Sequence, residues 1–108
     1  MRRVVLESPY AVDTVRHVDY ARACLKDCLA RGEAPIASHL LLTQVLDEQR
    51  PEQRGQGIAA GHLWIRVADA VVLYADLGLS AGMEQGIATA DLFGVPVETR
   101  YLGGVWAS

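Results

Sequence analysis

The stretch ADAVVLYADLGLSAGMEQG, residues 68–86, joins the most apolar run of the chain to a glycine-rich loop. The run at residues 70–75 indicates a strand buried on both faces, as in a parallel sheet. A helix is expected to follow from Ser80 to Phe93, with Gly94 at its end. Strand, loop and helix in this order form half of a crossover between two parallel strands.

Strands and helices alternate along the rest of the chain. The other expected strands cover residues 3–7, 34–38 and 96–102. The other expected helices cover residues 13–31 and 51–68, and residues 39–49 form a loop with a turn or two of helix. Asp13 suits the cap of the first helix, and Pro51 suits the first turn of the second. The order predicts an α/β fold, a small Rossmann-like (flavodoxin-like) parallel sheet of four to five strands with helices on both faces.

Length and composition exclude several classes of protein. The chain has 108 residues, of which 51% are hydrophobic, which suits one domain over residues 1–108. Its net charge of −3 lacks the basic excess of a protein that binds nucleic acid polymers. The apolar run near the N-terminus is too short for a signal peptide or a membrane span. We therefore expect a cytoplasmic protein with no membrane partner.

Three loops are expected to meet beyond the carboxyl ends of the strands, where ligands bind in folds of this class. Their candidate ligand-binding residues are Ser8, Pro9, Tyr10, His39, Ser80, Gly82 and Met83. Backbone N–H groups at the start of the helix after Ser80 favour an anion, although Ser80 is explained equally well as a plain helix cap. His39 suits a ligand contact, proton donation near neutral pH, or a structural role in its loop. Arg50 and Arg54 suit phosphate, although arginines near a helix start are usually solvated.

Three potential metal ligands, His17, Cys24 and Cys28, share one stripe of the first helix. That stripe is also the apolar face of the helix, and no C-x-x-C or H-E-x-x-H pattern is present. We interpret both cysteines as packing residues and expect no metal and no other cofactor. Gly57 and Gly61 share a face of the second helix, which indicates close approach of another backbone or of a ligand.

Several segments carry a family resemblance: VVLESPYA, PIASHLL, GIAAGHLW and DAVVLYADLGLSAGMEQGIATADLFGVPVETRYL. They resemble a family of small, uncharacterised bacterial and phage proteins related to nucleoside 2-deoxyribosyltransferases and deoxynucleoside monophosphate N-glycosidases. The resemblance spans nearly the whole chain. It implies a pocket for a small-molecule nucleoside or nucleotide, and a homo-oligomer, a dimer or larger. The apolar segment LWIRV, residues 63–67, and Trp106 are candidates for the subunit interface.

The resemblance also implies an acid-dependent reaction. In the related enzymes a glutamate attacks the sugar carbon, because a carboxylate can stabilise or trap the positive charge that develops there. The family pattern places that glutamate at Gly86, and a second acid within residues 59–61, where this chain has no acid. The candidate catalytic residues are therefore Glu84 and Asp76. Alternatively, Glu84 is a solvated residue that favours the helix start, and Asp76 is a residue that forms a turn.

Two functions follow from this pattern. The first is an enzyme, a hydrolase or transferase that cleaves an N-glycosidic bond. The second is a non-catalytic module that binds or senses a nucleotide ligand after losing the family carboxylate.

Overall fold

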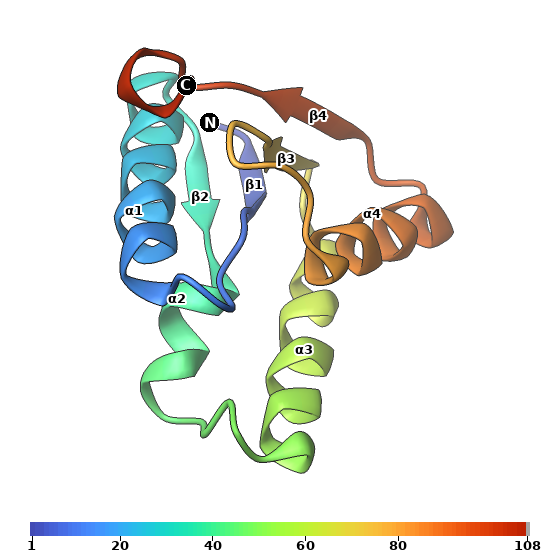
Figure 1. Ribbon diagram of the computed structural model, residues 1–108. Coiled ribbons are helices and arrows are strands. Elements are labelled where there is room, and N and C mark those ends of the chain that lie inside the picture. Colours follow the sequence, from blue (N-terminus) through green and yellow to red (C-terminus); the bar gives the residue numbers. More distant parts are fainter. Residues whose placement is uncertain (108) are drawn as a thin grey trace.

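Four parallel strands form the centre of the computed structural model, which describes residues 1–107 (Figure 1). The strands are β1 (Arg3–Glu7), β2 (Ala34–Ile36), β3 (Ala70–Tyr74) and β4 (Val97–Arg100), and their order in the sheet is β2-β1-β3-β4. In β3 every residue is buried, as its continuous apolar run predicts. The small parallel sheet of the predicted Rossmann-like fold is confirmed, with four strands.

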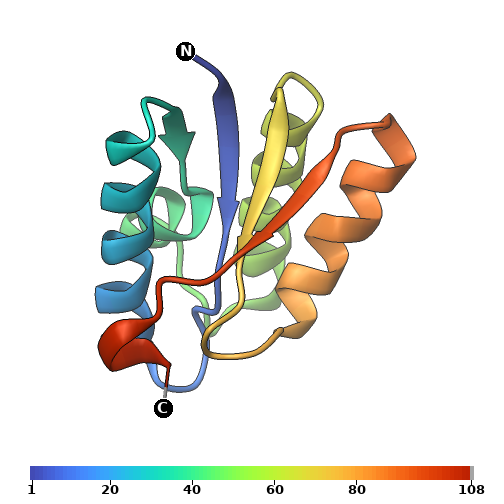
Figure 2. The ribbon, with the colours of Figure 1, turned by 90° about the horizontal axis from the view of Figure 1, so that it is seen from above.

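Helices cover both faces of this sheet, as Figure 2 shows. α1 (Thr14–Ala30) packs on one face, and α3 (Pro51–Ile65) and α4 (Ala81–Phe93) pack on the other. The shorter helices are α2 (Ser38–Leu41), η1 (Leu42–Gln44) and η2 (Gly104–Trp106). Because parallel strands can be joined only by crossovers, α1, α3 and α4 each return the chain to the start of the next strand.

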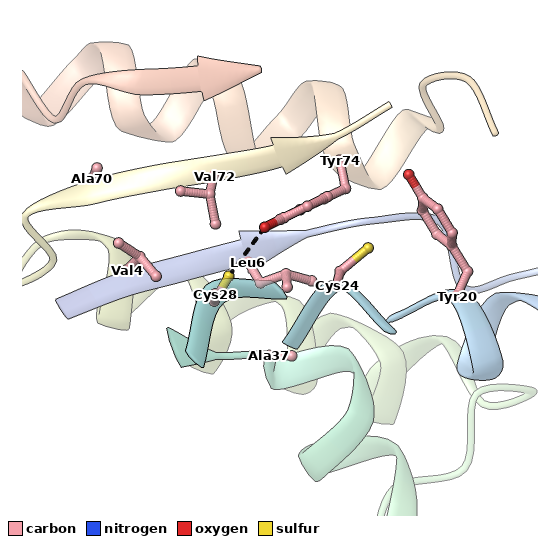
Figure 3. Close-up of a cluster of buried hydrophobic side chains, with 9 residues drawn as sticks. All are labelled: Val4, Leu6, Tyr20, Cys24, Cys28, Ala37, Ala70, Val72 and Tyr74. Carbon is pink, nitrogen blue, oxygen red and sulfur yellow. Dashed lines mark hydrogen bonds between the residues drawn. The ribbon is translucent and has the colours of Figure 1, made fainter. Parts of the chain in front are cut away.

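Side chains of α1 fill the core on their side of the sheet (Figure 3). Cys24 and Cys28 are fully buried there as free thiols, and the Cys28 sulfur lies 3.4 Å from the Tyr74 hydroxyl. Within residues 1–107 no three His, Cys, Asp or Glu side chains are grouped so that they could hold a metal ion. The rings of Trp106 and Tyr20 meet edge-on with centroids 5.1 Å apart. Trp106 is therefore a partly buried packing residue of this core, and its place in a subunit interface stays a prediction.

A buried ion pair crosses the same face of the sheet. Arg100 donates two hydrogen bonds of 2.7 Å to the Glu33 carboxylate, and both side chains are 7% exposed. Hydrogen bonds from Arg100, and from Arg2 at 2.7 Å, outweigh desolvation and lower the pKa of Glu33 to about 2. The end of β4 is thereby tied to the residue that precedes β2.

The element boundaries differ from prediction in a few places. The strand β2 ends at Ile36 because α2 begins at Ser38, and α3 ends at Ile65, three residues earlier than expected. Asp13 precedes α1 but makes no side-chain capping hydrogen bond. No helix within residues 1–107 is both long enough and apolar enough to cross a membrane.

Two of the three glycines of α3 face the segment that follows β2. A Cβ on Gly61 would lie 2.5 Å from Ser38 Oγ, and one on Gly57 would lie 3.1 Å from a methyl carbon of Leu46. The close approach predicted at these two glycines therefore comes from side chains and not from another backbone. This close contact holds α2 and the loop that follows it against α3.

Candidate functional site

A cleft of about 440 Å³ opens beyond the carboxyl ends of β1 and β3. The crossover after β1 runs to α1 on one face, and the crossover after β3 runs to α4 on the other. Ligands bind at such a divergence in open α/β sheets, and the volume suits a small molecule. The cleft is lined by all seven predicted ligand-binding residues, Ser8, Pro9, Tyr10, His39, Ser80, Gly82 and Met83. Their contact with a ligand stays a prediction.

One wall of the cleft is built from the loop after β1 and from α2. Ser8 is buried, and its Oγ lies 2.8 Å from Nε2 of His39. The rings of Tyr10 and His39 meet edge-on with centroids 6.3 Å apart. Burial lowers the pKa of His39 to about 4, so its imidazole is neutral near pH 7. His39 is therefore suited to hydrogen bonding, and not to proton donation as an imidazolium at neutral pH.

The opposite wall is the start of α4. Ser80 is the N-cap residue, and its Oγ accepts a hydrogen bond of 3.2 Å from the Met83 backbone N–H. The N–H groups of Ala81 and Gly82 belong to the first turn, where they have no partner within the helix. Ser80 thus serves as the helix cap, and this wall also keeps the donors that an anion requires.

A carboxyl group lies between β1 and α4. Glu7 ends β1 and lines the cleft, and its carboxyl group lies beside Gly86 of α4. A Cβ on Gly86 would be 2.8 Å from the carboxyl carbon of Glu7 and 2.8 Å from its Oε1. Burial raises the pKa of Glu7 to about 7. The cleft therefore contains an acid that is partly protonated at neutral pH.

The two predicted catalytic acids lie elsewhere. Glu84 is exposed on α4 and is not among the residues that line the cleft. Residues two apart on a helix point to nearly opposite sides, so the buried position of Gly86 turns Glu84 outward.

Asp76 is held by backbone and side-chain donors outside the cleft lining. Its carboxylate accepts hydrogen bonds from the Tyr20 hydroxyl and from the N–H groups of Leu102 and Gly103. Although desolvation opposes it, these hydrogen bonds lower the pKa of Asp76. Asp76 therefore joins α1 and the end of β3 to the chain after β4, which is a structural arrangement.

Further polar side chains reach the cleft from α3. His62 Nδ1 lies 2.9 Å from Thr89 Oγ1, which links α3 to α4, and burial lowers the pKa of His62. Arg54 lines the cleft, and its Nε lies 3.7 Å from a Glu48 carboxylate oxygen. Arg50 is exposed and does not line the cleft.

The sequence of the chain matches a known family along most of its length. A family model described as a domain of unknown function (DUF7768) matches residues 2–100. The chain belongs to this family. No curated protein matches this DUF7768 domain.

One solved structure has the same fold as this DUF7768 domain. It is a 2-deoxyribosyltransferase from the psychrotolerant bacterium Bacillus psychrosaccharolyticus, with 18% identity and a TM-score of 0.63. The similarity covers 94% of this chain and 74% of that enzyme. At this level of identity the similarity establishes the fold of the DUF7768 domain, which is the Rossmann-like fold of a deoxyribosyltransferase.

Sequence reasoning missed Glu7 and His62 as residues of the cleft. Glu7 was treated only as the end of a strand, yet an acid that ends a run as apolar as VVL at the ligand-binding edge is itself a signal. His62 carried no such signal, because its place depends on how α3 packs against α4.

Proposed function

We propose that this DUF7768 domain binds a nucleoside or nucleoside monophosphate in the cleft and cleaves its N-glycosidic bond, by hydrolysis or by sugar transfer. The observation that carries the proposal is the cleft itself, at the divergence of β1 and β3 in a fold shared with a 2-deoxyribosyltransferase. Its volume of about 440 Å³ suits a ligand of this size.

The walls of the cleft support complementary roles. The rings of Tyr10 and His39 offer an apolar surface with one hydrogen-bonding edge, which suits a base or a sugar. The first turn of α4 and the guanidinium of Arg54 offer N–H donors and positive charge, which suit a phosphate. These roles fit a ligand that has an aromatic end and an anionic end.

Incubation with a panel of deoxynucleosides and their 5′-monophosphates tests the proposal. Chromatography is expected to show free base released from at least one compound, and the same compound is expected to raise the melting temperature. A related N-glycosidase under the same conditions is the positive control. Absence of both effects across the panel would contradict the proposal.

A second candidate function is a nucleotide-binding module without catalysis. It is favoured by Gly86, which has no side chain where the family pattern places the nucleophile, and by the exposure of Glu84. Binding without base release would favour this candidate.

The expected homo-oligomer remains a prediction. Leu63, Trp64 and Val67 are 62%, 53% and 54% exposed, and Trp64 and Val67 line a groove of about 290 Å³ beside β2. Sedimentation is expected to give a mass of at least two chains, and Trp64→Glu is expected to lower it.

A further inference from the structure

Glu7 occupies the space that a side chain at position 86 would need. A Cβ built on Gly86 lies 2.8 Å from the carboxyl carbon and from one oxygen of Glu7, closer than real Cβ atoms approach such neighbours, and 3.2 Å from the other oxygen. The glycine therefore lets the carboxyl group reach this volume from β1. Position 86 of α4 has no acidic side chain, but the carboxyl group of Glu7 lies in the space beside it.

The Glu7 carboxyl group has no protein partner in this position. Among residues 1–107 no side chain or backbone N–H donates a hydrogen bond to it, and no cation pairs with it. By contrast, Asp76 and Glu33 each accept several hydrogen bonds. Glu7 is only partly buried, and its carboxyl oxygens are open to the cleft, where a ligand can reach them. Acids of this kind in a cleft are typical of functional sites.

We infer that Glu7 is the catalytic carboxylate of this cleft, delivered from β1 into the space that Gly86 leaves open. The inference rests on the proposed function, and it removes the main argument for a binding module that has lost its acid. In the family pattern the acid is a residue of α4, whereas in this chain it is a residue of β1. In both cases the carboxyl group occupies the same place in the cleft.

The proposed step uses the ionised form of Glu7. A carboxylate oxygen forms a bond to the anomeric carbon as the bond from that carbon to the base nitrogen breaks. The electron pair leaves with the base, which takes a proton from water. A second water then displaces the carboxylate from the sugar, and the proton it releases neutralises the hydroxide left by the first step. The net reaction consumes one water and yields the free sugar and the free base.

The test compares Glu7→Gln with a matched control, Asp91→Asn, which alters an exposed acid of α4 outside the cleft lining. Base release and melting temperature are measured with deoxynucleosides and their 5′-monophosphates. We expect Glu7→Gln to keep the rise in melting temperature caused by the ligand and to release base roughly 100-fold or more slowly. We expect Asp91→Asn to match the unaltered chain in both measurements.

Glu7→Ala with sodium azide provides a second readout. Azide is expected to enter the vacated volume and attack the anomeric carbon, so that a glycosyl azide forms together with free base. This product requires the anomeric carbon to lie beside the lost carboxylate. If Glu7→Gln folds poorly, Glu7→Ala with azide decides, and absence of the glycosyl azide overturns the inference.

The outcomes separate the two proposals. Base release by Glu7→Gln at the rate of the unaltered chain overturns this inference and leaves the proposed function standing. Ligand binding without base release in the unaltered chain also overturns it and leaves the binding function. If the unaltered chain neither binds a ligand nor releases base, both proposals are overturned.

Discussion

Burial shifts the pKa values of two residues of the cleft in opposite directions, Glu7 to about 7 and His39 to about 4. Between about pH 4.5 and 7, Glu7 holds a proton in the folded chain that it has lost in the unfolded chain, so its contribution to stability falls as pH rises. For His39 the unfolded chain holds the extra proton between about pH 4 and 6.5, so its contribution falls as pH decreases. The two effects partly cancel in the unaltered chain.

Glu7→Gln separates these two effects. We expect the variant to be more stable than the unaltered chain at pH 8, by up to about 3 kcal/mol, because it removes a buried charge. The difference is expected to shrink as pH falls through 7 and to vanish below about pH 4.5, where Glu7 becomes protonated in both states. Urea denaturation at pH 5 and at pH 8 measures it. An equal difference at both pH values would contradict the raised pKa.

Gly86→Ala tests the close approach between α4 and Glu7. The added Cβ meets the far end of a flexible side chain, and alanine favours a helix by up to about 1 kcal/mol over glycine, so we expect little loss of stability. We also expect the Glu7 carboxyl group to be displaced and base release to fall roughly tenfold or more. Denaturation and base release are measured on the same sample. Full activity would show that the position of the carboxyl group is unimportant.

At the scale of elements, Gly57 and Gly61 allow α3 to pack closely against the segment after β2. Gly61→Ala is expected to destabilise the fold by about 1–3 kcal/mol, because the new Cβ would meet both Oγ and Cβ of Ser38. The Ser38 Cβ is fixed to the backbone of α2 and cannot rotate away. Gly55→Ala is the matched control, since a Cβ on Gly55 meets nothing within 4 Å and is expected to preserve or raise stability. Equal effects of the two variants in urea denaturation would contradict this packing argument.

At the scale of the whole molecule, the ion pair of Arg100 and Glu33 joins residues that are 67 positions apart in the chain. Arg100→Met is expected to lower the free energy of unfolding by on the order of 3 kcal/mol, because Glu33 is left buried with only Arg2 as a partner. Arg3→Met is the control, since Arg3 is 70% exposed and 3.7 Å from Asp69. The control is expected to change stability by less than about 0.5 kcal/mol. Urea denaturation at pH 7 measures both.

Most of the fold was predictable because its signals are local. The apolar run of β3, the alternation of strands with helices, and the helix stop at Gly94 act within a few residues of chain. Such patterns determine where strands and helices form, and parallel strands then require crossovers on the two faces. The position of the cleft followed from the same order, since the carboxyl ends of β1 and β3 meet where their crossovers diverge.

The sequence by itself thus determined the class of fold, the edge of the sheet that forms the cleft, and the loops that line it. Only the tertiary structure decided which acid lies beside α4 in the cleft. Glu84 is turned outward by the rotation of α4, Asp76 is held by the chain after β4, and Glu7 reaches the cleft because Gly86 has no side chain. The physical reason is that these outcomes depend on how a side chain from one element fits against another, and residues 7 and 86 become neighbours only when β1 and α4 pack together.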